Sequence, residues 1–192
     1  MSLKDIKIGF VLTGSFCTFK KTIPKIKELI KLGSEVIPIM SFNSYNLDTK
    51  YGKAKDFINE IQEITGKEII HTLQDAEIIG PKNLTDIMII APCSGNTMSK
   101  LTYDIIDTPA TMAVKSHLRN ELPVVIAPST NSGLSGNAPS IAALLNRKNY
   151  YFVPFRQDNP ITKPRSIVFD PEYIIKTIEY ALEGKQIQPI LI

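Results

Sequence analysis

Small polar side chains cluster in four places along the chain, each directly after an apolar run. The four segments are Thr13-Gly14-Ser15, Ser41-Phe42-Asn43-Ser44, Ser94-Gly95-Asn96-Thr97 and Ser129-Thr130-Asn131-Ser132-Gly133. Taken singly, each is explained by helix capping, because Ser and Asn are ordinary N-cap residues. In open α/β sheets, however, ligands bind beyond the carboxyl ends of the strands. Four such segments at one sheet edge predict a crevice rich in hydrogen-bond donors and acceptors.

The first segment has the composition of a phosphate site. Gly14 permits close approach of a ligand to the backbone, the hydroxyls of Thr13 and Ser15 donate, and the helix expected next supplies free N–H groups. The segment contains neither GxGxxG nor GxxxxGK[ST], so the dinucleotide and P-loop fingerprints do not apply. A plain tight turn explains the same residues equally well, and both interpretations stay open.

Alternating strand and helix patterns position these segments. Five nearly continuous apolar runs, at 6–12, 36–40, 86–91, 124–127 and 150–153, are typical of parallel strands covered on both faces. Helical patterns lie between and after them, at 16–30, 54–65, 110–120, 140–147 and 171–183. Pro24 predicts a kink or a late start in the first helix. The series predicts a single α/β domain over residues 1–192, with a parallel sheet and right-handed crossovers.

One long stretch fits neither pattern. The sequence PFRQDNPITKPR, which begins at Pro154, is polar and rich in proline. Irregular stretches of this length in compact domains are typically active-site lids or interface arms. We therefore expect residues 154–170 to form a polar lid or interface loop. Asp170 and Pro171 then predict the N-cap and first position of the last helix.

The composition excludes several functional classes. The chain has 22 basic and 19 acidic residues, spread along its length, and a net charge of +3, which does not suggest nucleic-acid binding. No apolar run reaches the ~18 residues that span a membrane, and the charged N-terminus does not resemble a signal peptide. Cys17 and Cys93 form no CxxC pair, and only His71 and His117 accompany them. We expect two free thiols and no metal site.

Three segments resemble motifs of the flavoprotein family that contains the FMN-dependent cysteine decarboxylases. They are Thr13-Gly14-Ser15, the stretch APCSGNTMSKL at 91–101, and Pro128 with Asn131. The resemblance implies a Rossmann-like three-layer α/β/α fold and a homo-oligomer built of trimers, with FMN near an interface between protomers. It implies that Gly14 and Ser15, with Thr13, contact the flavin phosphate region. The rest of the FMN would be lined by Ser41, Ser94, Gly95, Asn96 and Thr97.

The chain also departs from the cysteine decarboxylases. Ile78 stands where those enzymes carry a His, and Thr130 stands at the Met position of their PxMN motif. The region that corresponds to their C-terminal substrate clamp contains no Cys. We therefore do not expect cysteine decarboxylation, and we interpret His71 as a surface or capping residue.

These departures match one branch of the family, the dipicolinate synthase B subunits. The resemblance is carried by GFVLTGSFCTF, EIIGPKN, IAPCSGNTMSKL, FVPFRQDNPITKP and the ending QPILI, and it covers essentially the whole chain. It implies a part in the oxidation of dihydrodipicolinate to dipicolinate, in the cytoplasm of the mother cell of a sporulating bacterium. It also implies a partner that binds NADP, the A subunit of dipicolinate synthase.

A dicarboxylate substrate requires cationic groups or N–H donors opposite its carboxylates. Asn131 and Arg156 are our candidates for catalysis, and Lys115, Arg119 and Lys163 are our candidates for substrate binding. A solvated surface charge also explains Lys115 and Arg119. No carboxylate or His is placed persuasively as a base.

Two functions from different classes stay open. The chain is either an FMN-dependent oxidoreductase subunit or a non-catalytic assembly and substrate-presenting subunit for an NADP-dependent partner. An FMN-dependent decarboxylase of another acid is a third alternative, disfavoured by the same departures from the decarboxylase motifs.

Overall fold

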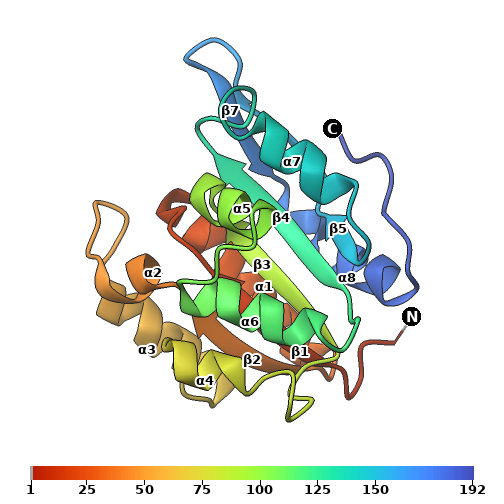
Figure 1. Cartoon of the computed structure of the whole chain (residues 1–192). Coiled ribbons are helices and arrows are strands. Elements are labelled where there is room, and N and C mark those ends of the chain that lie inside the picture. Colours follow the sequence, from red (N-terminus) through yellow and green to blue (C-terminus); the bar gives the residue numbers. More distant parts are fainter. Residues whose placement is uncertain (1) are drawn as a thin grey trace.

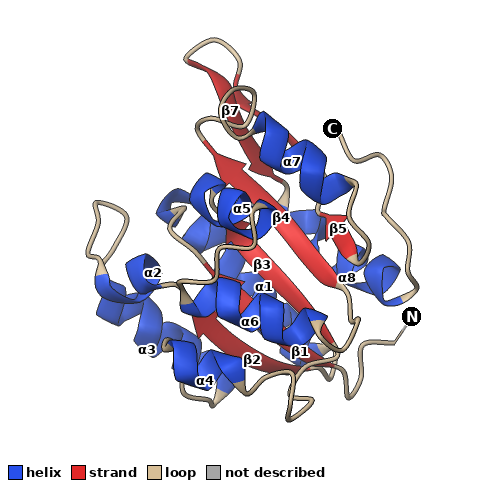
Figure 2. Ribbon diagram, viewed as in Figure 1, coloured by secondary structure: helices blue, strands red, loops and turns tan. Residues whose placement is uncertain are grey.

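The computed structural model describes residues 2–192 and shows a seven-stranded sheet between two layers of helices (Figures 1 and 2). The strands are β1 (Lys7–Leu12), β2 (Glu35–Met40), β3 (Ile87–Cys93), β4 (Val124–Thr130), β5 (Tyr150–Phe152), β6 (Phe155–Asn159) and β7 (Lys163–Phe169). The α-helices are α1 (Phe19–Lys31), α2 (Phe42–Asn46), α3 (Ala54–Thr65), α4 (Leu73–Glu77), α5 (Gly95–Thr102), α6 (Pro109–Leu118), α7 (Ala138–Leu145) and α8 (Ile174–Leu182). Two 3-10 helices, η1 (Phe16–Thr18) and η2 (Pro171–Tyr173), lead into α1 and α8.

The parallel part of the sheet has the order β2-β1-β3-β4, and β5 pairs with the first half of β4. This confirms the predicted α/β class, a Rossmann-like three-layer fold with a mainly parallel sheet. The chain leaves β1 for β2 on one side and reaches β3 on the other, so the strand order reverses between β1 and β3. Ligands in such folds bind beside that reversal, at the carboxyl ends of the strands.

The sheet is buried because its strands are apolar on both faces. All seven residues of β3 are buried, as are five of the six in β1. The helices α5, α6 and α7 cover the face that is in front in Figure 1, and α1 and α8 lie behind the sheet. Phe10, Phe19, Phe152 and Phe169 are among the largest side chains that are fully buried in this core. The strands and helices predicted from periodicity are therefore confirmed in type and order.

The first helix differs from its pattern at the N-terminal end. A 3-10 turn occupies Phe16–Thr18, and α1 begins at Phe19. Pro24 lies inside α1 on an exposed position. The α-helix therefore starts later than residue 16, and the 3-10 turn places its first N–H groups next to the end of β1.

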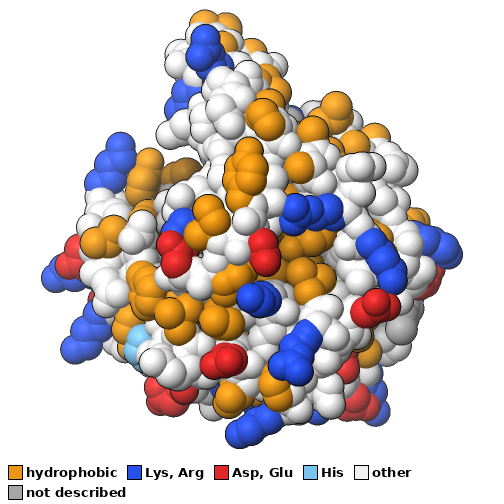
Figure 3. All heavy atoms as spheres, viewed as in Figure 1, with side chains coloured by type: hydrophobic (Ala, Val, Ile, Leu, Met, Phe, Trp, Pro, Cys, Tyr) orange, Lys and Arg blue, Asp and Glu red, His pale blue; other side chains and the backbone are white. Residues whose placement is uncertain are grey.

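The stretch after β5 is a β-hairpin, and the expectation of an irregular loop is wrong. β6 and β7 pair antiparallel, with Phe155 opposite Phe169 and Asn159 opposite Lys163. β7 also pairs antiparallel with the last residues of β4, so the sheet is not wholly parallel. The hairpin projects from the body, with hydrophobic side chains at its tip and basic ones below them (Figure 3). Ile161 at this tip is 90% exposed.

None of the helices described between residues 2 and 192 is both long and apolar enough to cross a membrane.

Candidate functional site

A cavity of about 660 Å³ opens where the β1 loop, the end of β4 and the hairpin meet. Its volume lies within the range of about 300–1,000 Å³ that is usual for small-molecule sites. The β1 loop and η1 form one wall, from Gly14 to Thr18, and the end of β4 contributes Ser129, Thr130 and Asn131. β6 and β7 close the other side. The cavity thus lies at the carboxyl edge of the sheet, where the sequence predicted a crevice.

The β1 loop, which lines this cavity, contains backbone donors that no acceptor uses. The amide of Ser15 donates to Thr13 O at 2.7 Å, and that of Thr18 donates to Ser15 O at 3.2 Å. Within residues 2–192, the N–H groups of Gly14, Phe16 and Cys17 have no acceptor. Free N–H groups at the start of a helix, with its positive dipole end, form an anion site. The donor set of this loop therefore fits a phosphate.

Thr13 is buried, and both hydrogen-bonding functions of its hydroxyl are already used. Thr13 Oγ1 donates to Pro92 O at 2.7 Å and accepts from the amide of Ser94 at 2.9 Å. It has no exposed surface and does not line the cavity. Thr13 therefore links the loops after β1 and β3 through its hydroxyl. The ligand contact that the motif implied for Thr13 finds no support in the structure.

We expect Thr13→Val to destabilise the protein by about 2 kcal/mol, because it keeps the shape but leaves a buried amide and a buried carbonyl without their partner. Thr22→Val is the matched control, since Thr22 is equally buried and its hydroxyl only donates to Thr18 O within the helical segment. Urea denaturation of both variants measures the difference. Equal destabilisation by the two changes would contradict this link between the loops.

Ser15 reaches across the sheet edge. Its Oγ donates to Ser129 O at 2.7 Å, which joins the β1 loop to the end of β4. Both residues line the cavity. Ser15 therefore lies at the cavity wall. Because its O–H is already donated, its oxygen remains only as an acceptor, for a ligand N–H or for a phosphate-bound water.

The predicted residues after β3 lie outside this cavity. Ser94 is the N-cap of α5 and accepts from the amide of Thr97 at 3.3 Å. Gly95 and Thr97 are buried, and Asn96 is exposed. A Cβ at Gly95 would come within 1.9 Å of Asn137 Oδ1, so this position is closed by packing. Within one chain, these residues form the N-terminal turn of α5, and none of them lines the cavity.

Ser41 also acts as a cap. Its side chain accepts from the amide of Ser44 at 3.3 Å at the start of α2, and only 8% of its surface is exposed. Ser44 Oγ in turn donates to Leu12 O at 2.8 Å. The segment therefore fixes α2 beside the end of β1, and Ser41 does not line the cavity.

Two ion pairs form the hairpin side of the cavity. Arg156 Nη1 lies 2.9 Å from Asp170 Oδ2, and Lys163 Nζ lies 2.6 Å from Asp158 Oδ2. Burial by itself raises the pKa of Asp170, but the Arg156 pair and the backbone N–H of Glu172 outweigh it, and the pKa is lowered. The hydrogen bond with Asp158 raises the pKa of Lys163. Both cations line the cavity. A part in catalysis for Arg156 and in substrate binding for Lys163 stays a prediction.

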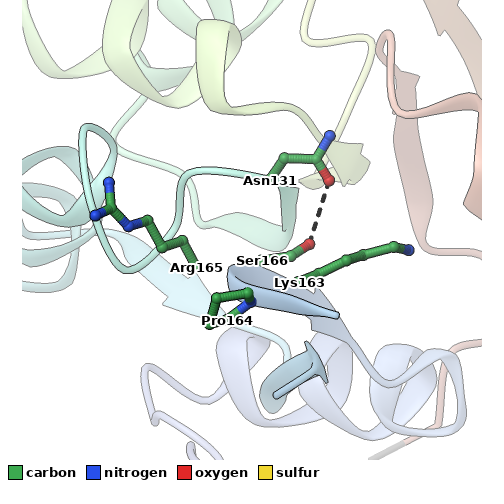
Figure 4. A pocket seen from close by; sticks show the side chains of 5 residues that line it. All are labelled: Asn131, Lys163, Pro164, Arg165 and Ser166. Atoms are coloured by element: carbon green, nitrogen blue, oxygen red, sulfur yellow. Dashed lines mark hydrogen bonds between the residues drawn. The ribbon is translucent and has the colours of Figure 1, made fainter. Parts of the chain in front are cut away.

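Asn131 lies at the end of β4, facing the hairpin. Ser166 Oγ donates to Asn131 Oδ1 at 3.3 Å (Figure 4). A smaller hollow of about 340 Å³ shares Asn131, Lys163 and Ser166 with the main cavity and adds Pro164 and Arg165. Figure 4 shows Lys163 and Arg165 extending in opposite directions. Asn131 and Lys163 are thus brought together, while Arg165 points elsewhere.

Lys115 and Arg119 are not brought to the cavity. Both are exposed, near and at the C-terminal end of α6, and neither lines either hollow. Because α6 leads into β4, this helix end lies by the beginning of the strand, at the opposite edge of the sheet. Their predicted substrate contact therefore finds no support within this chain.

Two lysines in the cavity were missed. Lys21 on α1 and Lys50 after α2 line it, and neither forms an ion pair with a described residue. Lys50 Nζ lies 5.3 Å from the ring centroid of Tyr51, a cation–π distance. The spacing of Lys21 was a usable signal, because it lies one helical turn after Cys17 and so on the side of the helix that begins at the β1 loop.

Neither histidine lines the cavity. His71 stacks on Tyr45 with ring centroids 3.9 Å apart, and its Nδ1 lies 3.0 Å from Ile69 O. His117 is buried between Thr85 and Pro123, and burial lowers its pKa. The two cysteines are free; Cys17 is exposed at the cavity, and burial raises the pKa of the Cys93 thiol.

Comparison with known proteins identifies the family of this chain. The sequence matches the family named Flavoprotein over residues 1–162. It is 44% identical over 191 residues to the B subunit of dipicolinate synthase from Bacillus subtilis (strain 168), an alignment that covers 100% of this chain and 96% of that protein. The crystal structure of the dipicolinate synthase B subunit from Bacillus halodurans C has a TM-score of 0.92 at 43% identity, covering 100% of this chain and 98% of the other.

A more distant structure shares the fold alone. The FMN-dependent cysteine decarboxylase SpaF has a TM-score of 0.71 at 19% identity and covers 94% of this chain and 97% of its own. The similarity between the two structures is therefore one of fold, in the sheet and the helices that cover it. With a family match over 162 residues and 44% identity along its full length, the chain belongs to the Flavoprotein family and, within it, to the dipicolinate synthase B subunits.

Proposed function

We propose that this chain binds FMN and a pyridine-type dicarboxylate, and contributes as the B subunit of a dipicolinate synthase to the oxidation of dihydrodipicolinate to dipicolinate. The observation that carries the proposal is the set of free N–H groups of Gly14, Phe16 and Cys17 at the wall of a cavity of about 660 Å³. Lys21, on α1 directly after this 3-10 turn, adds a positive charge to the same wall. Lys21 forms no ion pair with a described residue within 4 Å, although its charge helps to lower the pKa of Asp170.

The residues present fit the phosphate end of FMN. A phosphate accepts hydrogen bonds from backbone N–H groups and is stabilised by the helix dipole and by a nearby ammonium group. Gly14 allows this approach, because a ligand meets no side chain there. The O–H of Ser15 is used by Ser129 O, so its oxygen can accept from a water that hydrates the phosphate. FMN, when bound, supplies a two-electron acceptor for a dehydrogenation. The chain's own part is to hold and orient the groups and to limit water access.

The substrate side of the proposal rests on charge. Arg156 and Lys163 face the cavity from the hairpin, and Asn131 faces it from β4. Guanidinium and ammonium groups compensate the two carboxylates of the substrate, and Asn131 can donate a hydrogen bond to a carboxylate or accept one from a ring N–H. In this proposal the β6–β7 hairpin is the lid predicted for residues 154–170, built as two strands.

The partner is also part of the proposal. The relatives are named as the B component of a synthase, which supports a second component, the A subunit, and we infer that this partner binds NADP. We further infer a homo-oligomer built of trimers that acts in the cytoplasm of the mother cell during sporulation.

One observation favours a second candidate function, a substrate-presenting subunit. Among the described residues, no His lines the cavity, and the one acidic residue that does, Asp158, is paired with Lys163. Among the described lining residues, no imidazole or unpaired carboxylate is therefore available to accept a proton during ring oxidation. In that case the cavity binds the dicarboxylate and the partner carries out the redox step.

A visible absorption spectrum distinguishes the two functions. We expect the purified chain to retain a flavin band after incubation with FMN and desalting, and to retain little after the same treatment with riboflavin, because riboflavin lacks the phosphate. Addition of dihydrodipicolinate without oxygen should then bleach the band. Retention of neither flavin would rule out the FMN proposal, and retention without bleaching would favour the presenting subunit.

A further inference from the structure

Three polar side chains tie the loops after β1, β3 and β4 to one another in pairs. Thr13 joins the β1 loop to the β3 loop, and Ser15 joins the β1 loop to β4. The third tie, between the β3 side and β4, is Asn137, the residue before α7. No motif in the sequence points to Asn137, although it makes more hydrogen bonds than either of the other two.

The amide of Asn137 uses its full hydrogen-bonding capacity. Oδ1 accepts from Thr130 Oγ1 at 2.8 Å and from Ser132 Oγ at 2.5 Å. Nδ2 donates to Gly95 O at 3.1 Å and to Ser99 Oγ at 3.0 Å. Because a carbonyl only accepts, the contact with Gly95 O fixes which end of the amide faces α5.

These four bonds hold the chain on both sides of Asn131. Thr130 and Ser132 are its direct neighbours, and both donate to the same oxygen of Asn137. On the other side, Gly95 and Ser99 anchor the amide to α5. The backbone of Asn131, which lines the cavity, is therefore placed relative to α5 by a side chain that does not line the cavity itself.

We infer that Asn137 is a positioning residue that fixes the Asn131 segment against α5, so that the cavity has its binding geometry before a ligand arrives. The inference rests on the proposed function, because it takes FMN and the dicarboxylate as the ligands. Fully satisfied polar networks hold one arrangement, and the loss of one member releases the others. Every partner of Asn137 is neutral, so the tie depends on donor and acceptor geometry and not on charge.

The variant Asn137→Asp tests this, because it keeps the shape and the Oδ1 acceptor but replaces the NH₂ donor by an oxygen that faces Gly95 O. We expect FMN to bind about tenfold more weakly than to the unchanged protein at about pH 8, the equivalent of about 1.4 kcal/mol. The new carboxyl would face Gly95 O in a partly buried site, which favours its neutral form and raises its pKa above the usual value. Protonation then restores one donor, so the ratio between variant and unchanged protein should fall toward about twofold as the pH is lowered to 5. Circular dichroism confirms that both proteins remain folded at each pH.

Asn59→Asp is the matched control, because Asn59 is exposed in the middle of α3 and the same charge change there should leave FMN affinity unaltered at both pH values. Ser99→Ala is the milder second variant, which removes one of the four partners and should weaken binding about threefold. An equal loss of affinity in Asn137→Asp at both pH values, or no loss in either variant of the network, would overturn the inference.

The two proposals fail in different ways. If the unchanged protein takes up no FMN, the proposed cofactor is wrong, and the tie is then tested in the free protein by amide hydrogen exchange. The amide of Leu134 donates to Arg165 O at 3.0 Å and so reports on how the Asn131 segment is held against the hairpin. We expect it to exchange at least about tenfold faster in Asn137→Asp than in Asn59→Asp. Equal exchange would overturn the positioning role.

Discussion

Replacing Gly95 by alanine is expected to destabilise the protein by about 2 kcal/mol and to weaken FMN binding at least tenfold. Gly95 is the first residue of α5, where alanine is ordinarily favoured over glycine. Here the new Cβ would lie 1.9 Å from Asn137 Oδ1 and 2.5 Å from Thr130 Oγ1. The amide of Asn137 must leave its place, and four hydrogen bonds go with it.

Gly136→Ala is the matched control for this change. Gly136 lies directly before Asn137, yet a Cβ there meets no atom within 4 Å. We expect that control to stay within about 0.5 kcal/mol of the unchanged protein and to bind FMN normally. Urea denaturation and flavin fluorescence quenching measure the two effects. Similar behaviour of the two alanine variants would show that the crowding at Gly95 is relieved without loss of the network.

The sheet was predictable because its strands are apolar on both faces. The run from Ile87 to Ala91 has no polar residue, and such runs are typical of strands between two helical layers. The hairpin was not predictable in the same way. The residues of β6 from 156 to 159 are exposed on both faces, so neither period-2 alternation nor an apolar run marks this strand. Proline at 160 and 164 added to the appearance of a loop.

The candidate site was partly predictable, and the limits have physical reasons. The position of Gly14 and Ser15 follows from the end of a strand leading into a helix, which places them at the carboxyl edge of the sheet. A motif does not say which of its residues point outward: Thr13 and Thr97 were assigned to the cofactor by resemblance, and both are buried in this chain.

Long-range contacts account for the residues that were missed. Asn137 meets Gly95 and Ser99 across about forty positions of sequence, and no local pattern connects these residues. Positive charge alone was not enough to predict a substrate contact. Lys115 and Arg119 are cationic, but they lie at the end of α6 that is far from the cavity. The direction of a helix relative to the sheet decides which of its ends meets a ligand, and the strand order had to be known first.

Reversing the charge at Arg156 is expected to remove dicarboxylate binding. Arg156→Glu places a carboxylate where a guanidinium faced the cavity, 2.9 Å from Asp170 in the unchanged protein. The substrate then meets repulsion instead of a bidentate partner, and we expect dipicolinate to bind at least a hundredfold more weakly. Turnover with the partner protein should be lost to a similar degree.

Arg156→Glu should also change how the stability of the protein depends on pH. The pair with Arg156 helps to hold the pKa of Asp170 below its usual value of 3.8, so its stabilising effect is present above that value and is lost as the pH falls through the lower, folded value. Without the guanidinium, and with a like charge beside it, Asp170 should protonate at higher pH. The acid unfolding transition of Arg156→Glu should therefore begin at a higher pH than that of the unchanged protein.

Lys115→Glu is the control that separates a local effect from net charge. It makes the same change in net charge on an exposed residue of α6, at the opposite edge of the sheet. We expect it to leave dipicolinate affinity within about twofold, because exposed charges beyond about 10 Å are screened at ordinary ionic strength. Titration calorimetry with dipicolinate measures both variants. If the two weaken binding equally, the hairpin arginine is not a substrate contact; if Arg156→Glu alone fails, the dicarboxylate binds between the hairpin and the end of β4.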